Sequence, residues 1–412
     1  MVQIDESQAA LARQRTEFQQ SREPIPVPDG AREILANQFA YVSDFRFNSD
    51  QSNALVVGHA PPVDPGLQPS DTFVVDMASE KILARYKIHL PSTALSPNRP
   101  RLAAIGHTSE SVADDSTPTA AAQAKGKSKL DPLASGGADD FRWSYDVRVS
   151  TIDYKDWQVI VNKTRRELHA IGWSANGQQV ITVETGSDTP SAEELEASKQ
   201  RNPNQLLDIV GDPRVVFKFW NSQTGELLST VAGPKLNYDR ATLSTDGRLA
   251  ALWDHKHQNE IVICDPATGK ELYRLEGHER AMGDVVFSPR NRYLATRAEF
   301  ETGMSFATTD VWDLHSHQRV CTLEAHASRM TFSPDESLLA TANVDVDADQ
   351  KVHYDVSVWD VKTGAEQMRL QPRGSTLNIG FLSNTELVTT SNFDYDSGRN
   401  ARVFVWDIAD KK

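Results

Sequence analysis

Short apolar runs separated by polar turns fill the chain from about residue 30 onward. The segments 284–287, 293–296, 310–312 and 319–323 form one set that is rich in β-branched and apolar residues. None of them has the three-to-four-residue spacing of apolar positions that marks a helix, so each is expected to be a strand. The pattern therefore predicts an all-β fold built from groups of four short strands.

Two kinds of position recur along the chain. An apolar residue precedes a short polar turn at Phe47, Leu95, Trp173, Leu243, Phe287, Phe332 and Phe381. An apolar or β-branched run ends in Asp or Asn at Asp76, Asp153, Asn221, Asp265, Asp313, Asp360 and Asp407. Successive members of the second series lie 77, 68, 44, 48, 47 and 47 residues apart, so four intervals share a period and two contain insertions. A period in the forties with four strands per unit is typical of a β-propeller blade, and the two series predict seven blades.

A recurring turn follows three members of the second series. After Asn221, Asp265 and Asp360, the sequence continues with three residues and then Gly225, Gly269 and Gly364. Asp and Asn side chains bond the backbone of such turns, and Gly supplies a positive φ without steric cost. These segments are therefore expected to join the third and fourth strands of a blade.

The two ends of the chain are expected to meet in one blade. Only five residues follow Asp407, too few for a fourth strand. The segment 30–36 reads like 269–275, and Gly30 lies 17 residues before Phe47, much as Gly269 lies 18 before Phe287. We therefore expect the N-terminal strand to complete the last blade and to close the ring, which hides the sheet edges of an open array.

Several short motifs resemble those of the WD-repeat family. They are the pair Gly277-His278, the Ser-Pro turns after Phe287 and Phe332, and the Trp-Asp pairs at Trp312, Trp359 and Trp406, and the resemblance covers about residues 30–412. It implies a propeller with a structural hydrogen-bond network inside each blade, contributed here by His278, Thr296, Trp312, His326, Thr341, Trp359 and Trp406. The Asp that the family places about six residues before each Trp is replaced by Phe306, His353 and Asn400.

Residues 1–29 precede the expected ring. Ile4, Leu11 and Phe18 recur every seven residues in a stretch of helix formers that stops at a Pro-rich segment beginning at Pro24. This spacing predicts a short helical extension, which either packs on the propeller, frays as a leader or binds a partner. The domain organisation expected is an extension over 1–29 and a propeller over 30–412, with insertions at about 107–146 and 186–213.

The insertions point to one face of the ring. Five of the seven expected blades carry extra residues between their second and third strands, at about 107–146, 186–213, 298–308, 343–354 and 391–401. Strand alternation brings all of them out on the same face, where a binding surface is expected. The first is expected to be disordered, and the second to include a short helix over 189–200. In the last three, the predicted partner-binding residues are the anchors Phe300, Phe306, Phe393 and Tyr395 and the acidic residues Asp345, Asp347, Asp394 and Asp396.

Charge and composition limit the partners. The formal net charge of −14 and a pI near 5.3 would repel a nucleic acid unless basic residues were segregated on one face, and no basic stripe is visible. Two cysteines are too few for a disulfide framework, and no apolar run approaches membrane-spanning length. These features predict a cytoplasmic protein with no membrane partner, whose ring is monomeric on its own.

Recognisable catalytic or metal-binding motifs are missing from the sequence. Asp345, Asp347 and Asp349 resemble the start of a calcium loop, but Gln350 and Val356 stand where Gly and Glu are required. A cation at these carboxylates and a solvated acidic loop both stay open. The pairs His255/His257 and His315/His317 lack an evident third ligand, and no nucleophile elbow or phosphate loop occurs.

The sequence therefore predicts a non-catalytic scaffold that binds a protein or peptide through the loop-bearing face of a propeller, with no cofactor. Two alternatives stay open. One is a propeller hydrolase or lyase with a metal at the mouth of the central tunnel. The other is a sensor or regulatory module of a larger multidomain protein.

Overall fold

A computed structural model gives the fold of the chain. It describes residues 27–36, 38–39, 41–47, 51–59, 71–86, 92–96, 101–111, 141–151, 157–164, 167–185, 214–235, 238, 240–254, 260–277, 282–298, 308–325, 327–346, 352–372, 374–392 and 401–409. The described residues form strands and turns and contain no helix. The predicted helices before Gly30 and over 189–200 lie outside the described residues.

The strands pair into antiparallel sheets of four. Six sheets have side chains described in every one of their strands. In order from the innermost strand, they are β2 (Tyr41–Phe47), β3 (Asn53–His59), β4 (Asp71–Asp76), β5 (Lys81–Tyr86); β10 (Glu167–Trp173), β11 (Gln179–Thr185), β12 (Val216–Asn221), β13 (Leu227–Ala232); β14 (Arg240–Leu243), β15 (Ala250–Trp253), β16 (Glu260–Asp265), β17 (Lys270–Glu276); β18 (Met282–Phe287), β19 (Tyr293–Ala298), β20 (Thr309–Asp313), β21 (Gln318–Leu323); β22 (Ala327–Phe332), β23 (Leu338–Val346), β24 (Val352–Asp360), β25 (Glu366–Leu370); and β26 (Ser375–Phe381), β27 (Glu386–Asn392), β28 (Ala401–Asp407), β1 (Ala31–Ile34).

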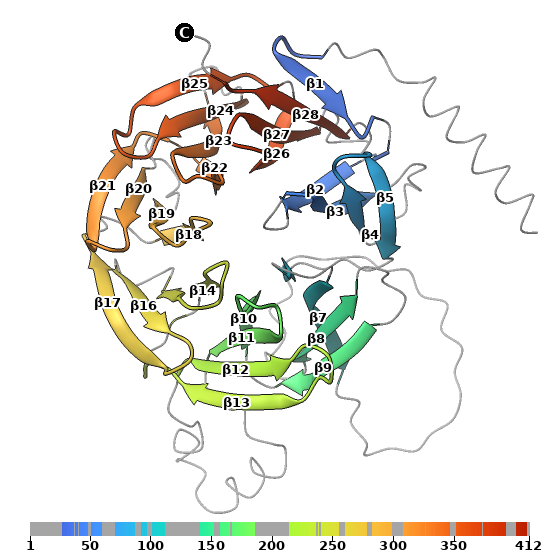
Figure 1. The fold of residues 1–412 in the computed structure, drawn as a ribbon, viewed down its shortest axis with the longest axis vertical. Coiled ribbons are helices and arrows are strands. Elements are labelled where there is room, and N and C mark those ends of the chain that lie inside the picture. Colours follow the sequence, from blue (N-terminus) through green and yellow to red (C-terminus); the bar gives the residue numbers. More distant parts are fainter. Residues whose placement is uncertain are drawn as a thin grey trace, which may run out of the picture.

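A further sheet of four is formed by β6 (Ser92–Leu95), β7 (Arg101–Ser111), β8 (Phe141–Thr151) and β9 (Trp157–Thr164). The side chains of β8 and β9 lie outside the described residues. The sheets stand around a common centre, with β2, β14, β18, β22 and β26 innermost and β13, β17, β21 and β25 along the rim (Figure 1). The predicted all-β propeller is confirmed at the level of its architecture.

The ring closes through a strand from each end of the chain. β1 pairs antiparallel with β28, from Ala31 opposite Trp406 to Ile34 opposite Val403. Glu80, in the turn between β4 and β5, accepts a hydrogen bond from the backbone N–H of Leu35 at 2.9 Å, and Glu33 pairs with Arg402. The predicted completion of the last sheet by the N-terminal strand is confirmed.

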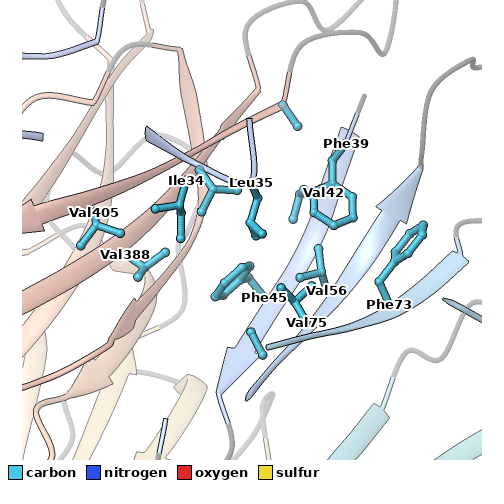
Figure 2. Packing of buried hydrophobic residues seen from close by; sticks show 13 residues of the cluster. Ile34, Leu35, Phe39, Val42, Phe45, Val56, Phe73, Val75, Val388 and Val405 are labelled. Carbon is cyan, nitrogen blue, oxygen red and sulfur yellow. The ribbon is translucent and has the colours of Figure 1, made fainter. Parts of the chain in front are cut away.

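The cores lie between neighbouring sheets. At the junction of the first and last sheets, Ile34 and Leu35 are only 2% and 3% exposed, and they pack with Val405 from one sheet and Phe45 from the other. Figure 2 shows these side chains filling the space between the two sheets. Because each sheet needs its neighbour to cover its apolar face, stability depends on an unbroken ring.

Turns at one end of the sheets are tied to each other across sheet boundaries. Glu336, buried between two sheets, accepts hydrogen bonds from the Ser288 hydroxyl at 2.5 Å and the Arg290 N–H at 2.6 Å. Thr245 donates to the carbonyl of Pro289 at 2.8 Å, and Asn384 accepts from the N–H of Asp335 at 3.0 Å. These contacts connect the short turns β14–β15, β18–β19, β22–β23 and β26–β27, each of which joins the first and second strands of its sheet.

Two expected insertions are partly regular hairpins. Residues 107–111 and 141–146, inside the expected insertion 107–146, pair with each other in β7 and β8. Likewise β23 and β24 stay paired until Val346 meets Val352, inside the expected insertion 343–354. Antiparallel pairing needs only backbone hydrogen bonds, so polar side chains did not stop these strands as the sequence pattern suggested.

Candidate binding site at the channel mouth

The innermost strands of the propeller surround a central cavity of about 1120 Å³. Its walls come from β2, β14, β18, β22 and β26, together with the turns that follow several of them. Each described innermost strand ends at a member of the first recurring series, such as Phe287 in β18 or Phe332 in β22. That series therefore sets the register of the channel wall.

A bulge recurs at the same place in five innermost strands, β2, β10, β18, β22 and β26. The residue that follows the bulge lies three positions before the first-series residue of its sheet. These residues are Asp44, Ala170, Asp284, Arg329 and Asn378, and Arg240 has the same register in β14. A bulge redirects the side chain beside it, and four of the six, Asp44, Asp284, Arg329 and Asn378, line the cavity.

This ring of residues lies at the end of the sheets where the second and third strands connect. Asp284 pairs with Arg297, one residue before β19 ends, and Asn378 pairs with Thr390, two residues before β27 ends. Because antiparallel strands place the start of one beside the end of the next, these six residues and the extended hairpins lie at the same end of the propeller. We call these six residues and the cavity beside them the channel mouth.

The two acidic residues of the channel mouth differ in their partners. Asp44 forms an ion pair with Arg46, with Nε 2.8 Å from Oδ2, and accepts the N–H of Phe45 at 2.9 Å. Asp284 accepts the N–H of Val285 at 3.0 Å. Both carboxylates therefore cap the backbone at the bulge, and only Asp44 has a described ion pair within 4 Å.

Arg297 reaches the cavity from the second strand of its sheet. A Cβ added to Gly283 would lie 2.7 Å from Nη2 and 2.9 Å from Cζ of Arg297, so the guanidinium occupies the space left by the glycine. The Nε atom of Arg297 is buried and has no hydrogen-bond partner. In β3, β23 and β27 the corresponding residues are Val57, Ala342 and Thr390, none of which is charged.

The hydrogen-bond network implied by the WD-repeat resemblance is present in part. The indole Nε1 of Trp312 donates to the Thr296 hydroxyl at 3.2 Å, and that of Trp359 donates to Thr341 at 2.9 Å. Trp406 makes the same bond to Thr389 at 2.9 Å, and Trp220 makes it to Thr182 at 3.1 Å. Thr182, Thr389 and the role of Trp220 were missed, although each Thr occupies the same register relative to its Trp. His278 and His326 lie outside the described residues.

Replacing Trp359 by Phe is expected to lower the free energy of unfolding by about 1–3 kcal/mol, since the fully buried Thr341 hydroxyl loses its donor. The double variant Trp359→Phe/Thr341→Val removes both partners and should be less destabilised than the sum of the single variants. Urea unfolding of the four proteins measures this coupling. Strictly additive effects would show that the bond contributes nothing.

Most of the predicted partner-binding residues lie outside the described residues. These are Phe300, Phe306, Asp347, Phe393, Asp394, Tyr395 and Asp396, together with Asp349 of the suggested cation loop. The backbone of Asp345 is described and pairs with His353 in the β23–β24 hairpin. None of the residues of the channel mouth was among the site residues predicted from the sequence.

The described residues hold no group of three or more His, Cys, Asp or Glu side chains arranged to bind a metal ion. Of the two histidine pairs, only His315/His317 is described, and the His317 ring stacks on Tyr273 at a centroid distance of 3.7 Å. Nor does this part of the chain form a helix long and apolar enough to cross a membrane.

The acidic residues that end the third strands serve the turns. Asp360 accepts the N–H groups of Lys362 at 3.1 Å and Thr363 at 2.8 Å. Burial works to raise the pKa of Asp360, but these bonds and the Thr363 hydroxyl hold it below its ordinary value. Its carboxylate is thus engaged in a structural role, as the turn pattern predicted.

Comparison with models of known protein families gives no match, and comparison with curated proteins gives none either. What the described residues define is a β-propeller with a polar channel mouth at the end that carries its extended hairpins.

Proposed function

We propose that this protein is a non-catalytic scaffold that binds a protein or peptide at the channel mouth and the hairpins around it. The observation that carries the proposal is the coincidence of two features at one end of the ring. The polar residues Asp284, Arg329 and Asn378 line the cavity there, and the β7–β8 and β23–β24 hairpins extend at the same end. Polar groups of a preformed concave site orient a ligand, and projecting loops add contact area.

The opposite end of the ring favours a structural role. Its short turns form bonds across sheet boundaries through Glu336, Asn384 and Thr245, so their polar groups are already used. A surface whose groups are paired internally offers fewer partners to a ligand. This asymmetry supports placing the partner at the channel mouth.

We further propose that the ring is a seven-bladed propeller of the WD-repeat type. The sheet β6–β9, added to the six sheets with side chains described in every strand, supports that count. Trp–Thr hydrogen bonds at the same register in four sheets support the resemblance. The cytoplasmic location and the monomeric state predicted from the sequence are likewise proposals.

Metal analysis of the purified protein separates the scaffold from a hydrolase or lyase with a metal at the tunnel mouth. A scaffold is expected to carry less than stoichiometric zinc or calcium after dialysis against a chelator. One tightly bound ion per chain would favour the enzyme. At the end of the cavity that carries the extended hairpins, the described lining includes two carboxylates, Asp44 and Asp284, from two different sheets. A third, Asp246, lines the cavity from the β14–β15 turn at the opposite end.

The binding surface is tested by affinity purification from the native cell with mass spectrometry. In the test variant, two-residue Asn-Gly turns replace 298–308, 345–353 and 393–400, which leaves paired residues on both sides of each turn, such as Val344 opposite Tyr354. The control is Arg248→Glu, whose side chain is 78% exposed at the opposite end. We expect the control to retain the partner captured by the native chain and the trimmed variant to lose it. Equal capture by both variants would place the surface elsewhere.

A further inference from the structure

The unpaired guanidinium of Arg297 is the starting point. Arg297 lines the cavity, its Nε is buried without a partner, and no ion pair joins it to any described carboxylate within 4 Å. Asp284, its cross-strand neighbour, instead accepts a backbone N–H. A partly buried charge without a counter-ion or full hydrogen bonding is costly, so an oxyanion supplied from outside would relieve a deficit already present.

Gly283 permits this arrangement. The guanidinium of Arg297 crosses the innermost strand where any larger residue would carry a Cβ, at 2.7–3.1 Å from its three nearest atoms. In β2 and β22 the bulge residue is instead a serine, and Ser43 and Ser328 each donate to a carbonyl of the second strand at 3.1 and 3.0 Å. The β18 sheet therefore differs from its equivalents in opening a path for a charged side chain to the cavity.

The next two sheets continue the arc of donors. Arg329 of β22 is exposed at the channel mouth, and its one described hydrogen bond runs from Nη1 to the Ser328 carbonyl at 3.0 Å. Asn378 of β26 is 3% exposed, lines the same cavity, and its Nδ2 has no acceptor. Three successive sheets thus present N–H donors at one side of the channel mouth, and two of them, Arg297 and Asn378, contribute a buried donor atom without a partner.

We propose that the channel mouth binds a carboxylate of an acidic peptide segment, held by the guanidinium groups of Arg297 and Arg329, with the Asn378 amide donating to an adjacent oxygen of the peptide. The inference rests on the proposed scaffold function and names the chemistry of its partner. Guanidinium groups hold planar carboxylates through paired N–H donors. The net charge of −14 disfavours a long polyanion such as a nucleic acid, whereas a short segment with a few carboxylates can be accommodated locally.

The test uses the purified full chain and a fluorescein-labelled hexapeptide of alternating Glu and Gly, compared with its Gln counterpart by fluorescence polarisation. The Glu peptide is expected to bind at least about tenfold more tightly than the Gln peptide, and Arg297→Gln and Arg329→Gln should each remove most of that difference. Arg248→Gln, a matched arginine at the opposite end, should leave it unchanged. Equal binding of the two peptides, absence of binding at millimolar protein, or full binding by both channel variants would overturn the proposal.

Gly283→Ala tests the geometry while keeping both arginines. Its Cβ meets the flexible end of Arg297, so the protein should keep its unfolding midpoint and lose about tenfold in affinity for the Glu peptide. Competition at constant ionic strength distinguishes a carboxylate site from a phosphate site. If inorganic phosphate displaces the Glu peptide at a concentration far below the acetate concentration needed for the same displacement, the site is a phosphate site and the carboxylate proposal is rejected. The scaffold proposal has its own test. It fails if the variant with trimmed hairpins still captures the partner.

Discussion

Deletion of residues 30–36 will abolish cooperative folding of the protein and leave it aggregation-prone. The deletion removes β1, the only described partner of the outer edge of β28, and takes Ile34 and Leu35 from the core between the first and last sheets. Losing one buried Ile or Leu side chain costs about 2–5 kcal/mol, so losing both is comparable to the 5–15 kcal/mol total stability of a typical domain. Circular dichroism during urea unfolding, together with size-exclusion chromatography, measures the outcome.

A chain lacking residues 1–22 is the control. It keeps β1 and the bond from the Leu35 N–H to Glu80, so its unfolding midpoint should match that of the full chain. A soluble, cooperatively unfolding protein without residues 30–36 would show that the ring does not depend on this closure.

Replacement of Gly269 by Ala should lower the free energy of unfolding by about 3 kcal/mol or more. The φ of Gly269 is +70°, where an L residue costs about 1–2 kcal/mol. The added Cβ would also lie 2.0 Å from the carbonyl oxygen of Ala232, so the turn of one sheet would be forced away from the outer strand of the preceding sheet. Overpacking against backbone has no cheap relief.

Gly277 separates the two causes, because its φ is also positive at +102° but an added Cβ would meet no atom within 4 Å. Gly277→Ala should therefore lose only the backbone contribution, and its urea midpoint should lie well above that of Gly269→Ala. Equal midpoints for the two variants would mean that the close approach of Gly269 to Ala232 is relieved at no cost.

Much of the fold follows from local patterns in the sequence. Residues such as Phe287 and Phe332 end the innermost strands, and residues such as Asp313 and Asp360 end the third strands. Both kinds of position carry their own local cause, since an apolar strand end precedes a polar turn and the Asp carboxylate bonds that turn. The register of a blade can therefore be predicted from short segments.

The channel mouth was harder to predict because its residues share a position and not a chemistry. Asp44, Asp284, Arg329 and Asn378 each stand three residues before a first-series residue, which is a signal that the sequence contains. The bulge that turns them toward the cavity is a property of backbone pairing, however, and no residue type marks it.

The contribution of Arg297 depends on its contact with Gly283 on the neighbouring strand, fourteen residues away in the sequence. The residues equivalent to Arg297 in the second strands of two other sheets are Val57 and Ala342. The repeat pattern alone therefore predicts an apolar residue at this position. Only the juxtaposition with Gly283 across the β18–β19 pair reveals that the guanidinium passes into the cavity.

Photocrosslinking in the native cell tests most directly whether the channel-mouth end recognises the partner. A photoreactive phenylalanine is placed at Val352, 44% exposed on the β23–β24 hairpin, or at Arg248 in the β14–β15 turn of the opposite end. We expect a discrete crosslinked protein from position 352 that is missing from position 248. Crosslinking of that protein from position 248 alone, or of no protein from either position, would contradict the proposed binding surface.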